Sequence, residues 1–168
     1  DAQSRSTQTN LGQVITSAMA HAFDPPLEGA MVNGGSIRLD DFLEGGITPI
    51  DFFRVLPFGD GVLKVQMTGA LLSEILSYGE AQKGDGAYLQ RYGLEQGIDQ
   101  LWHIGGNRIE PDQLYWIAIS EFLMQGYDIL FLTPDNPGVR SVIFPKVDAL
   151  AADIRQSIIQ YLKHEEIK

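Results

Sequence analysis

The sequence predicts a single α+β domain, and three observations support that class. Some segments repeat apolar residues at the spacing of an amphipathic helix, whereas others alternate apolar and polar residues as strands do. The two kinds of segment are mixed along the chain, and no linker divides it. A chain of 168 residues that is 44% hydrophobic is also long enough to bury one core. One unit over residues 1–168 is therefore expected.

The first third of the chain predicts two helices and a strand. Residues 10–23 repeat apolar side chains at helical spacing, with Asn10 as the expected N-terminal cap. Residues 29–33 are an apolar run typical of a short buried strand. In the segment ITPIDFF a threonine and a proline favour the start of a short helix, whose Ile50 and Phe53 are expected to face inward.

The middle of the chain predicts a strand, a helix and then further strands. Residues 62–67 alternate apolar and polar side chains, and Thr68 is suited to cap the helix that follows. The inner face of that helix is expected to consist of Leu71, Leu72, Ile75 and Leu76. A glycine-rich stretch then leads into an extended segment, and residues 101–120 look like two strands joined through a glycine-asparagine turn.

The end of the chain predicts one more helix. After the loop TPDNPG, helical spacing begins at about Asp148. The apolar face of this helix is expected to consist of Val147, Leu150, Ile154, Ile158 and Leu162. The charged tail KHEEIK would then follow as a solvated end.

Composition excludes several classes of function. The net charge of −10 repels phosphate backbones and anionic lipids, so neither nucleic acid nor a membrane surface is an expected partner. No apolar run approaches the roughly 18 to 20 residues of a membrane span. The absence of cysteine excludes thiol chemistry, disulfides and cysteine-bound zinc, and it leaves the redox compartment open.

The histidines do not predict a metal centre or a catalytic triad. His21, His103 and His164 are scattered, and none has a second ligand at a useful spacing. The sequence also lacks a G-x-S-x-G elbow, a Walker loop and a G-x-G-x-x-G fingerprint. No metal and no cofactor is therefore expected in this segment.

Four stretches are chemically unusual for a plain domain. In VNGGSIR, two glycines allow a close backbone approach, and Asn33 and Arg38 supply an amide and a guanidinium suited to an anion. In LPFGDG, a proline and a glycine flank Phe58, so this ring is a candidate for stacking on a ligand. SEFLMQGYD places Phe122 just after a predicted strand, with Asp128 in the loop beyond. The fourth stretch, SRSTQTN, contains Arg5.

Each of these features also has an ordinary structural explanation. Arg5 lies just before the first helix, where an anion would feel the helix N-terminus, yet single arginines are usually surface ion-pair partners. A single phenylalanine is more often a core residue than a clamp, and paired glycines usually mark turns. Only the combination of all four stretches favours a binding site.

The combination resembles a known family. The segments TNLGQVI, VNGGSIR, ITPIDFFRVLPFGDGVLKVQMTGALLSEIL, GAYLQRYGL and YWIAISEFLMQGYD are similar, in this order, to the C-terminal domain of the 5'-nucleotidase family. That family includes ecto-5'-nucleotidase and the bacterial periplasmic UDP-sugar hydrolase. The resemblance covers nearly the whole chain. It implies a four-layer α/β/β/α domain with mixed sheets, where the residues alone indicate only α+β.

The resemblance also implies a division of labour. Family members join an N-terminal metallophosphoesterase domain, which carries two divalent metal ions, to a C-terminal domain that binds the nucleotide. No counterpart of the metal domain is expected within these 168 residues. This segment alone is therefore expected to bind substrate and not to hydrolyse it. The resemblance further implies a periplasmic, cell-surface or secreted parent protein.

Individual roles follow from the matching positions. By resemblance, Phe58 and Phe122 sandwich the base, Asp128 accepts the ribose hydroxyls, and Gly86 brings its backbone to the base edge. Arg5, Asn33 and Arg38 would form the polar grip on the phosphate end.

Two departures from the family pattern stand out. Asp60 replaces an asparagine, and an ionised carboxylate accepts hydrogen bonds but does not donate one to a ring nitrogen. Tyr127 and Ile129 replace glycines around Asp128, so that loop is open to a different shape. Three readings stay open: a 5'-nucleotidase domain, the same domain of a UDP-sugar hydrolase or cyclic-nucleotide phosphodiesterase, and a non-catalytic binding module.

Overall fold

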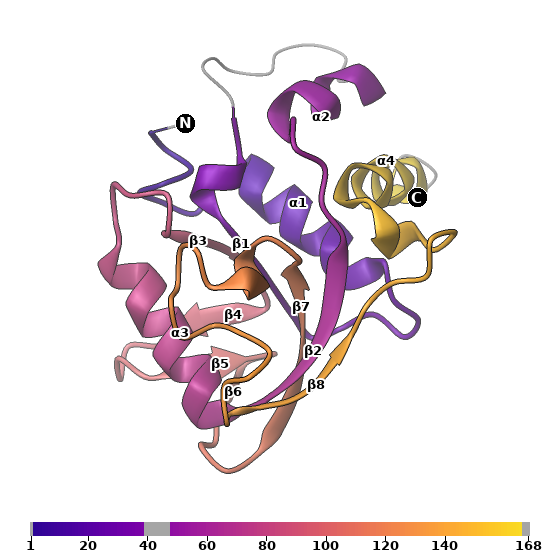
Figure 1. Ribbon diagram of the computed structural model, residues 1–168. Coiled ribbons are helices and arrows are strands. Elements are labelled where there is room, and N and C mark those ends of the chain that lie inside the picture. The colour runs from indigo at the N-terminus through magenta and orange to yellow at the C-terminus, as the bar shows by residue number, and fades with distance from the viewer. Residues whose placement is uncertain (1, 39–47, 166–168) are drawn as a thin grey trace.

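A computed structural model describes residues 2–38 and 48–165 of the chain (Figure 1). Four α-helices occur in this part of the chain: α1 (Asn10–His21), α2 (Pro49–Val55), α3 (Gly69–Ala81) and α4 (Ile154–Glu165). The strands are β1 (Gly29–Asn33), β2 (Val62–Thr68), β3 (Leu89–Tyr92), β4 (Leu94–Gln96), β5 (Trp102–Ile104), β6 (Asn107–Arg108), β7 (Leu114–Ser120) and β8 (Val139–Ile143).

The strands form one large and one small sheet. The large sheet has the order β3-β1-β7-β2-β8, in which β1 and β7 run parallel and every other pair is antiparallel. The small sheet, β4-β5-β6, is antiparallel throughout. The predicted α+β class with a mixed sheet is therefore confirmed.

The core lies on both faces of the large sheet. On one face, α1, α2 and α4 cover a cluster that includes Ile15, Val32, Phe52 and Ile158. On the other face, α3 and the small sheet share a cluster with β2 and β7, and Figure 1 shows α3 beside β4 and β5. All four predicted inner residues of α3 belong to that second cluster. The structure thus contains the helices and the two sheets of the predicted α/β/β/α arrangement.

The structure corrects two predictions about the helices. The N-terminal cap of α1 is Thr9, whose hydroxyl accepts the N–H of Gly12 at 2.9 Å, and Asn10 is instead the first helical residue. On α2, Ile50 and Phe53 were expected to face inward but are exposed, whereas Phe52 and Val55 are buried. The prediction assigned the wrong face of this short helix to the core, because Phe52 and Phe53 are adjacent and either one fits the helical spacing.

Two further predictions change in the last third of the chain. The hairpin after β5 closes with β6 through Gly105 and Gly106, both at positive φ, while β7 joins the large sheet. The last helix starts at Ile154, not near Asp148, and Val147 is fully exposed. The edge strand β8 was not predicted, because its sequence VRSVI does not alternate apolar and polar residues.

Candidate functional site

A cavity of about 500 Å³ opens where several loops meet at one end of the large sheet. Its walls come from the carboxyl ends of the parallel strands β1 and β7, the loop before β2 and the start of α4. Ligands commonly bind outside the carboxyl ends of parallel strands. The cavity is lined by Arg5, Val32, Asn33, Gly35, Ser36, Arg38, Leu56, Phe58, Gly59, Asp60, Gly86, Ser120, Phe122, Gln125, Asp128 and Ile154. All eight residues singled out from the sequence are among them.

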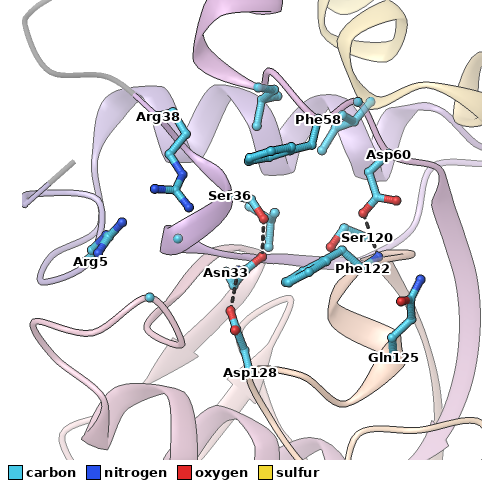
Figure 2. Close-up of a pocket in the computed structure, with 16 residues that line it drawn as sticks. Arg5, Asn33, Ser36, Arg38, Phe58, Asp60, Ser120, Phe122, Gln125 and Asp128 are labelled. Atoms are coloured by element: carbon cyan, nitrogen blue, oxygen red, sulfur yellow. Dashed lines mark hydrogen bonds between the residues drawn. The ribbon is translucent and has the colours of Figure 1, made fainter.

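Two phenylalanine rings lie across the cavity from each other (Figure 2). Phe58 follows α2 and is 77% exposed, and Phe122 follows β7 and is 36% exposed. The Arg38 guanidinium carbon lies 5.8 Å from the centre of the Phe58 ring. Phe122 contacts Tyr127, with ring centres 5.6 Å apart. A planar ligand that entered the gap would remove apolar surface of both rings from water.

Asn33 uses its amide to position other residues of the cavity. It is buried at the end of β1, where its Nδ2 donates to Oδ2 of Asp128. Its Oδ1 accepts the hydroxyl of Ser36 at 2.6 Å, and Figure 2 shows the resulting chain of hydrogen bonds. Asn33 therefore fixes the Asp128 carboxylate, whose remaining acceptor positions stay available for hydroxyl groups.

The loop around Asp128 contains a tight turn at Gly126. Gly126 adopts a left-handed conformation with φ of 76°. Tyr127 and Ile129 are not among the residues with positive φ in the described part of the chain. Ile129 is fully buried in the core, whereas Tyr127 is exposed beside Phe122. The loop is thus anchored by an apolar side chain at the position after Asp128.

Asp60 is held on both its side chain and its backbone. One carboxylate oxygen accepts the N–H of Phe122 at 2.7 Å, and its carbonyl accepts the N–H of Ile154 at 2.8 Å. The pKa of Asp60 is raised to about 6, mainly by burial and also by the nearby Glu121, although the hydrogen bond from the N–H of Phe122 lowers it. The carboxyl therefore changes charge in mildly acidic solution.

The two arginines lie at the opposite end of the cavity from Asp60 in Figure 2. Arg38 is exposed and Arg5 is half-buried, and the carbonyl of Arg5 accepts the N–H of Gly84 at 2.8 Å. Gly35 donates its N–H to the carbonyl of Gly86 at 2.9 Å. A Cβ on Gly35 would lie 3.1 Å from the Cα of Gly86, so the two segments approach closely where they meet.

Some residues of the cavity were not singled out from the sequence. Ser36, Ser120 and Gln125 lie inside the unusual stretches but were not selected there. Ile154 belongs to α4, and only its helical spacing was noted. The neighbouring Arg155 packs against Gly59, where an added Cβ would overlap its guanidinium. No sequence signal pairs the start of α4 with a loop about ninety positions earlier.

The described residues contain neither a metal-binding cluster nor a membrane-spanning helix. Nowhere in residues 2–38 and 48–165 do three histidine, aspartate or glutamate side chains gather closely enough to bind a metal ion. Over the same residues, no helix has both the length and the apolar surface needed to cross a bilayer.

Sequence comparisons place this cavity in a family context. The family model described as "5'-nucleotidase, C-terminal domain" matches residues 1–133. A 5'-nucleotidase of Vibrio cholerae is 32% identical over 151 residues, which is 87% of this chain and 27% of that protein. Protein UshA of Escherichia coli is 29% identical over 158 residues, 91% of this chain and 28% of that protein. The chain belongs to the 5'-nucleotidase C-terminal domain family.

Solved structures show the same fold. A 5'-nucleotidase precursor from Thermus thermophilus superimposes with a TM-score of 0.74 at 22% identity, over 98% of this chain and 34% of that one. The NAD nucleotidase of Haemophilus influenzae gives a TM-score of 0.62 at 18% identity, over 90% of this chain and 30% of that one. The chain thus spans about a quarter to a third of the proteins that it matches.

Proposed function

We propose that this chain is the nucleotide-binding, substrate-specificity domain of a 5'-nucleotidase-type phosphohydrolase that releases phosphate from nucleotides. The observation that supports it most is the meeting of eight residues from five separate stretches in one cavity. Two phenyl rings face each other there, with two arginines at one end of the cavity, Asp60 at the other and Asp128 hydrogen-bonded to Asn33. This arrangement matches the three chemical parts of a nucleotide: base, sugar and phosphate.

Each part of the ligand has a matching group in the cavity. The base would lie between Phe58 and Phe122, where stacking contributes about 1–3 kcal/mol per ring. The ribose hydroxyls would donate to Asp128, which Asn33 already orients. Arg5 and Arg38 would bind the phosphate end, since guanidinium groups bind anions through paired N–H donors. Gly35 and Gly86 would let the backbone approach the ligand closely.

Hydrolysis itself would belong to a different part of a longer protein. We propose a parent with an N-terminal metallophosphoesterase domain, whose two divalent metal ions would supply a metal-activated water. The described side chains of the present chain do not fit such a metal pair, and no catalytic step is assigned to them. We propose further that the parent acts in the periplasm, at the cell surface or after secretion.

The proposal is tested by calorimetric titration of the 168-residue chain with adenosine and with AMP. Binding is expected to be weak, with a Kd of roughly 0.1 to 10 mM, because association costs offset most of the gain from two stacks. The double variant Phe58→Ala/Phe122→Ala should lose it. Phe144→Ala removes an exposed phenylalanine outside the cavity and serves as the matched control. If the folded chain binds neither ligand at about 10 mM, the proposal is wrong.

A further inference from the structure

We propose that Asp60 makes the cavity select guanine over adenine, because its fixed carboxylate recognises a base edge with two adjacent N–H donors. The inference rests on the proposed function, and it names the class of base that the site prefers.

Asp60 lies where it would contact the edge of a bound base. Figure 2 shows Arg5 and Arg38 at one end of the cavity and Asp60 at the other, with the two rings between them. A nucleotide whose phosphate lies near the arginines would therefore direct its base toward Asp60. The edge of a purine that lies farthest from its sugar is the Watson–Crick edge.

The carboxylate is held rigidly enough to discriminate. The N–H of Phe122 binds one oxygen, and the N–H of Ile154 binds the backbone carbonyl of the same residue. Asp60 is thus fixed relative to one ring of the clamp. A carboxylate has about four acceptor positions, so several remain after the bond from Phe122.

The chemistry of the two purines then differs. Guanine presents N1–H and an amino group side by side, and both donate to a carboxylate. Adenine presents one amino group flanked on either side by an acceptor nitrogen, so an ionised carboxylate places its second oxygen against a lone pair. A well-placed bidentate contact discriminates between bases by about 1–3 kcal/mol, which corresponds to roughly five- to 150-fold in affinity.

The preference should depend on pH in a defined direction. The carboxylates near Asp60 are Glu121, directly after β7, and Asp153, directly before α4, and Asp153 is itself paired with Arg155. Together with burial, the two carboxylates favour the neutral form of Asp60 in mild acid. A protonated carboxyl has one donor and one acceptor, which matches the adenine edge. The preference for guanine should therefore disappear as the pH falls below about 6.

The test compares the affinities of GMP, IMP and AMP for the 168-residue chain at about pH 7.5 and about pH 5. Ratios between nucleotides are used because the charge of the phosphate then cancels. At the higher pH we expect GMP to bind about tenfold more tightly than AMP, with IMP between them because it lacks the amino donor. At the lower pH the ratio should approach one.

The variant Asp60→Asn separates the inference from the proposed function. It keeps the shape and the acceptor for Phe122, and it should bring the GMP to AMP ratio close to one at both pH values. Glu121→Gln removes a neighbouring carboxylate outside the cavity and should leave the ratio at about pH 7.5 unchanged. If GMP and AMP bind equally to the unaltered chain, or if Asp60→Asn keeps the preference, the inference is overturned and the proposed function stands. If no nucleotide binds to the folded chain, both are overturned.

Discussion

The two walls of the cavity are built in different ways. Phe122 lies in a segment that the core holds, since Leu123, Met124 and Ile129 are buried close to it in sequence. Phe58 lies on a loop, and its ring is largely exposed. The start of α4 contacts that loop, through the N–H of Ile154 on the Asp60 carbonyl and through Arg155 against Gly59. The Phe122 wall is therefore held by the core beside the sheet, whereas the Phe58 wall also depends on contacts with the start of α4.

The difference also appears in the comparison with the family. The match to the family model ends at residue 133, so it includes both phenylalanines but not α4. Yet Ile154 lines the cavity and donates to the carbonyl of Asp60. In this chain, part of the support for the Phe58 wall thus comes from outside the matched region.

The largest expected effect tests the wall that the core holds. Ile129→Ala removes a fully buried side chain next to Asp128 and should lower the free energy of unfolding by about 2–4 kcal/mol, through lost burial and the cavity left behind. Urea denaturation followed by circular dichroism measures the change. The neighbouring Leu130 is exposed, and Leu130→Ala should stay within about 0.5 kcal/mol. Equal effects of the two variants would show that Ile129 does not anchor the loop.

The next prediction compares the two rings directly. Phe58→Ala and Phe122→Ala should each weaken nucleoside binding by about 1–3 kcal/mol, because each removes one stacking surface. Only Phe122→Ala should also lower stability measurably, since its ring packs on Tyr127 while Phe58 is mostly exposed. Thermal unfolding and calorimetric titration of both variants give the two quantities. A loss of stability in Phe58→Ala without a loss of binding would reverse the comparison.

The Asp60 carboxyl, which accepts the N–H of Phe122, should affect stability in a pH-dependent way. The folded-state pKa of Asp60 is raised to about 6 from an ordinary value of 3.8, so its contribution to stability is fully present below about pH 4 and is lost as the pH rises through 6. Because the group is partly solvated, the cost of its charge is about 1–2 kcal/mol. Asp60→Asn should remove that cost at neutral pH and have little effect near pH 4. Denaturation curves across this pH range measure the free energy of unfolding of both proteins. A difference between them that stays constant with pH would contradict the prediction.

The smallest expected effect tests the support from α4. Arg155 is bound to Asp153, lies 4.4 Å from the centre of the Phe53 ring, and packs against Gly59. Arg155→Ala should leave the Phe58 loop less well fixed and weaken nucleoside binding by about 0.5–1 kcal/mol. Lys163→Ala, an exposed cation on the same helix, is the matched control. If both variants bind like the unaltered chain, the helix does not support that wall.

Local signals explain which parts of the fold were predictable from the sequence. The β2 strand and α3 were predicted with the correct cap and inner face, because Thr68 and the alternation of residues 62–67 act within a few positions. The partner of β7 and the start of α4 were not predictable in this way. They depend on which distant segments pack together, and no local pattern specifies that.

The site shows the same contrast between features set by local sequence and features set by contacts between distant segments. Its residue types came from short stretches and from the family resemblance, and the structure brings all of them to one cavity. The use of the Asn33 amide to hold Asp128 could not be foreseen, since the two residues lie 95 positions apart. The raised pKa of Asp60 likewise results from burial between β7 and α4, which only the folded chain produces.

The most direct test of the central claim, that a base binds between Phe58 and Phe122, is a proton NMR titration of adenosine with the 168-residue chain. A base enclosed by two phenyl rings lies in the shielding region of both, so its H2 and H8 signals should move upfield as protein is added. Phe58→Ala and Phe122→Ala should each reduce the shift, and the double variant should abolish it. Binding that leaves the base protons unshifted while the ribose signals move would contradict the claim.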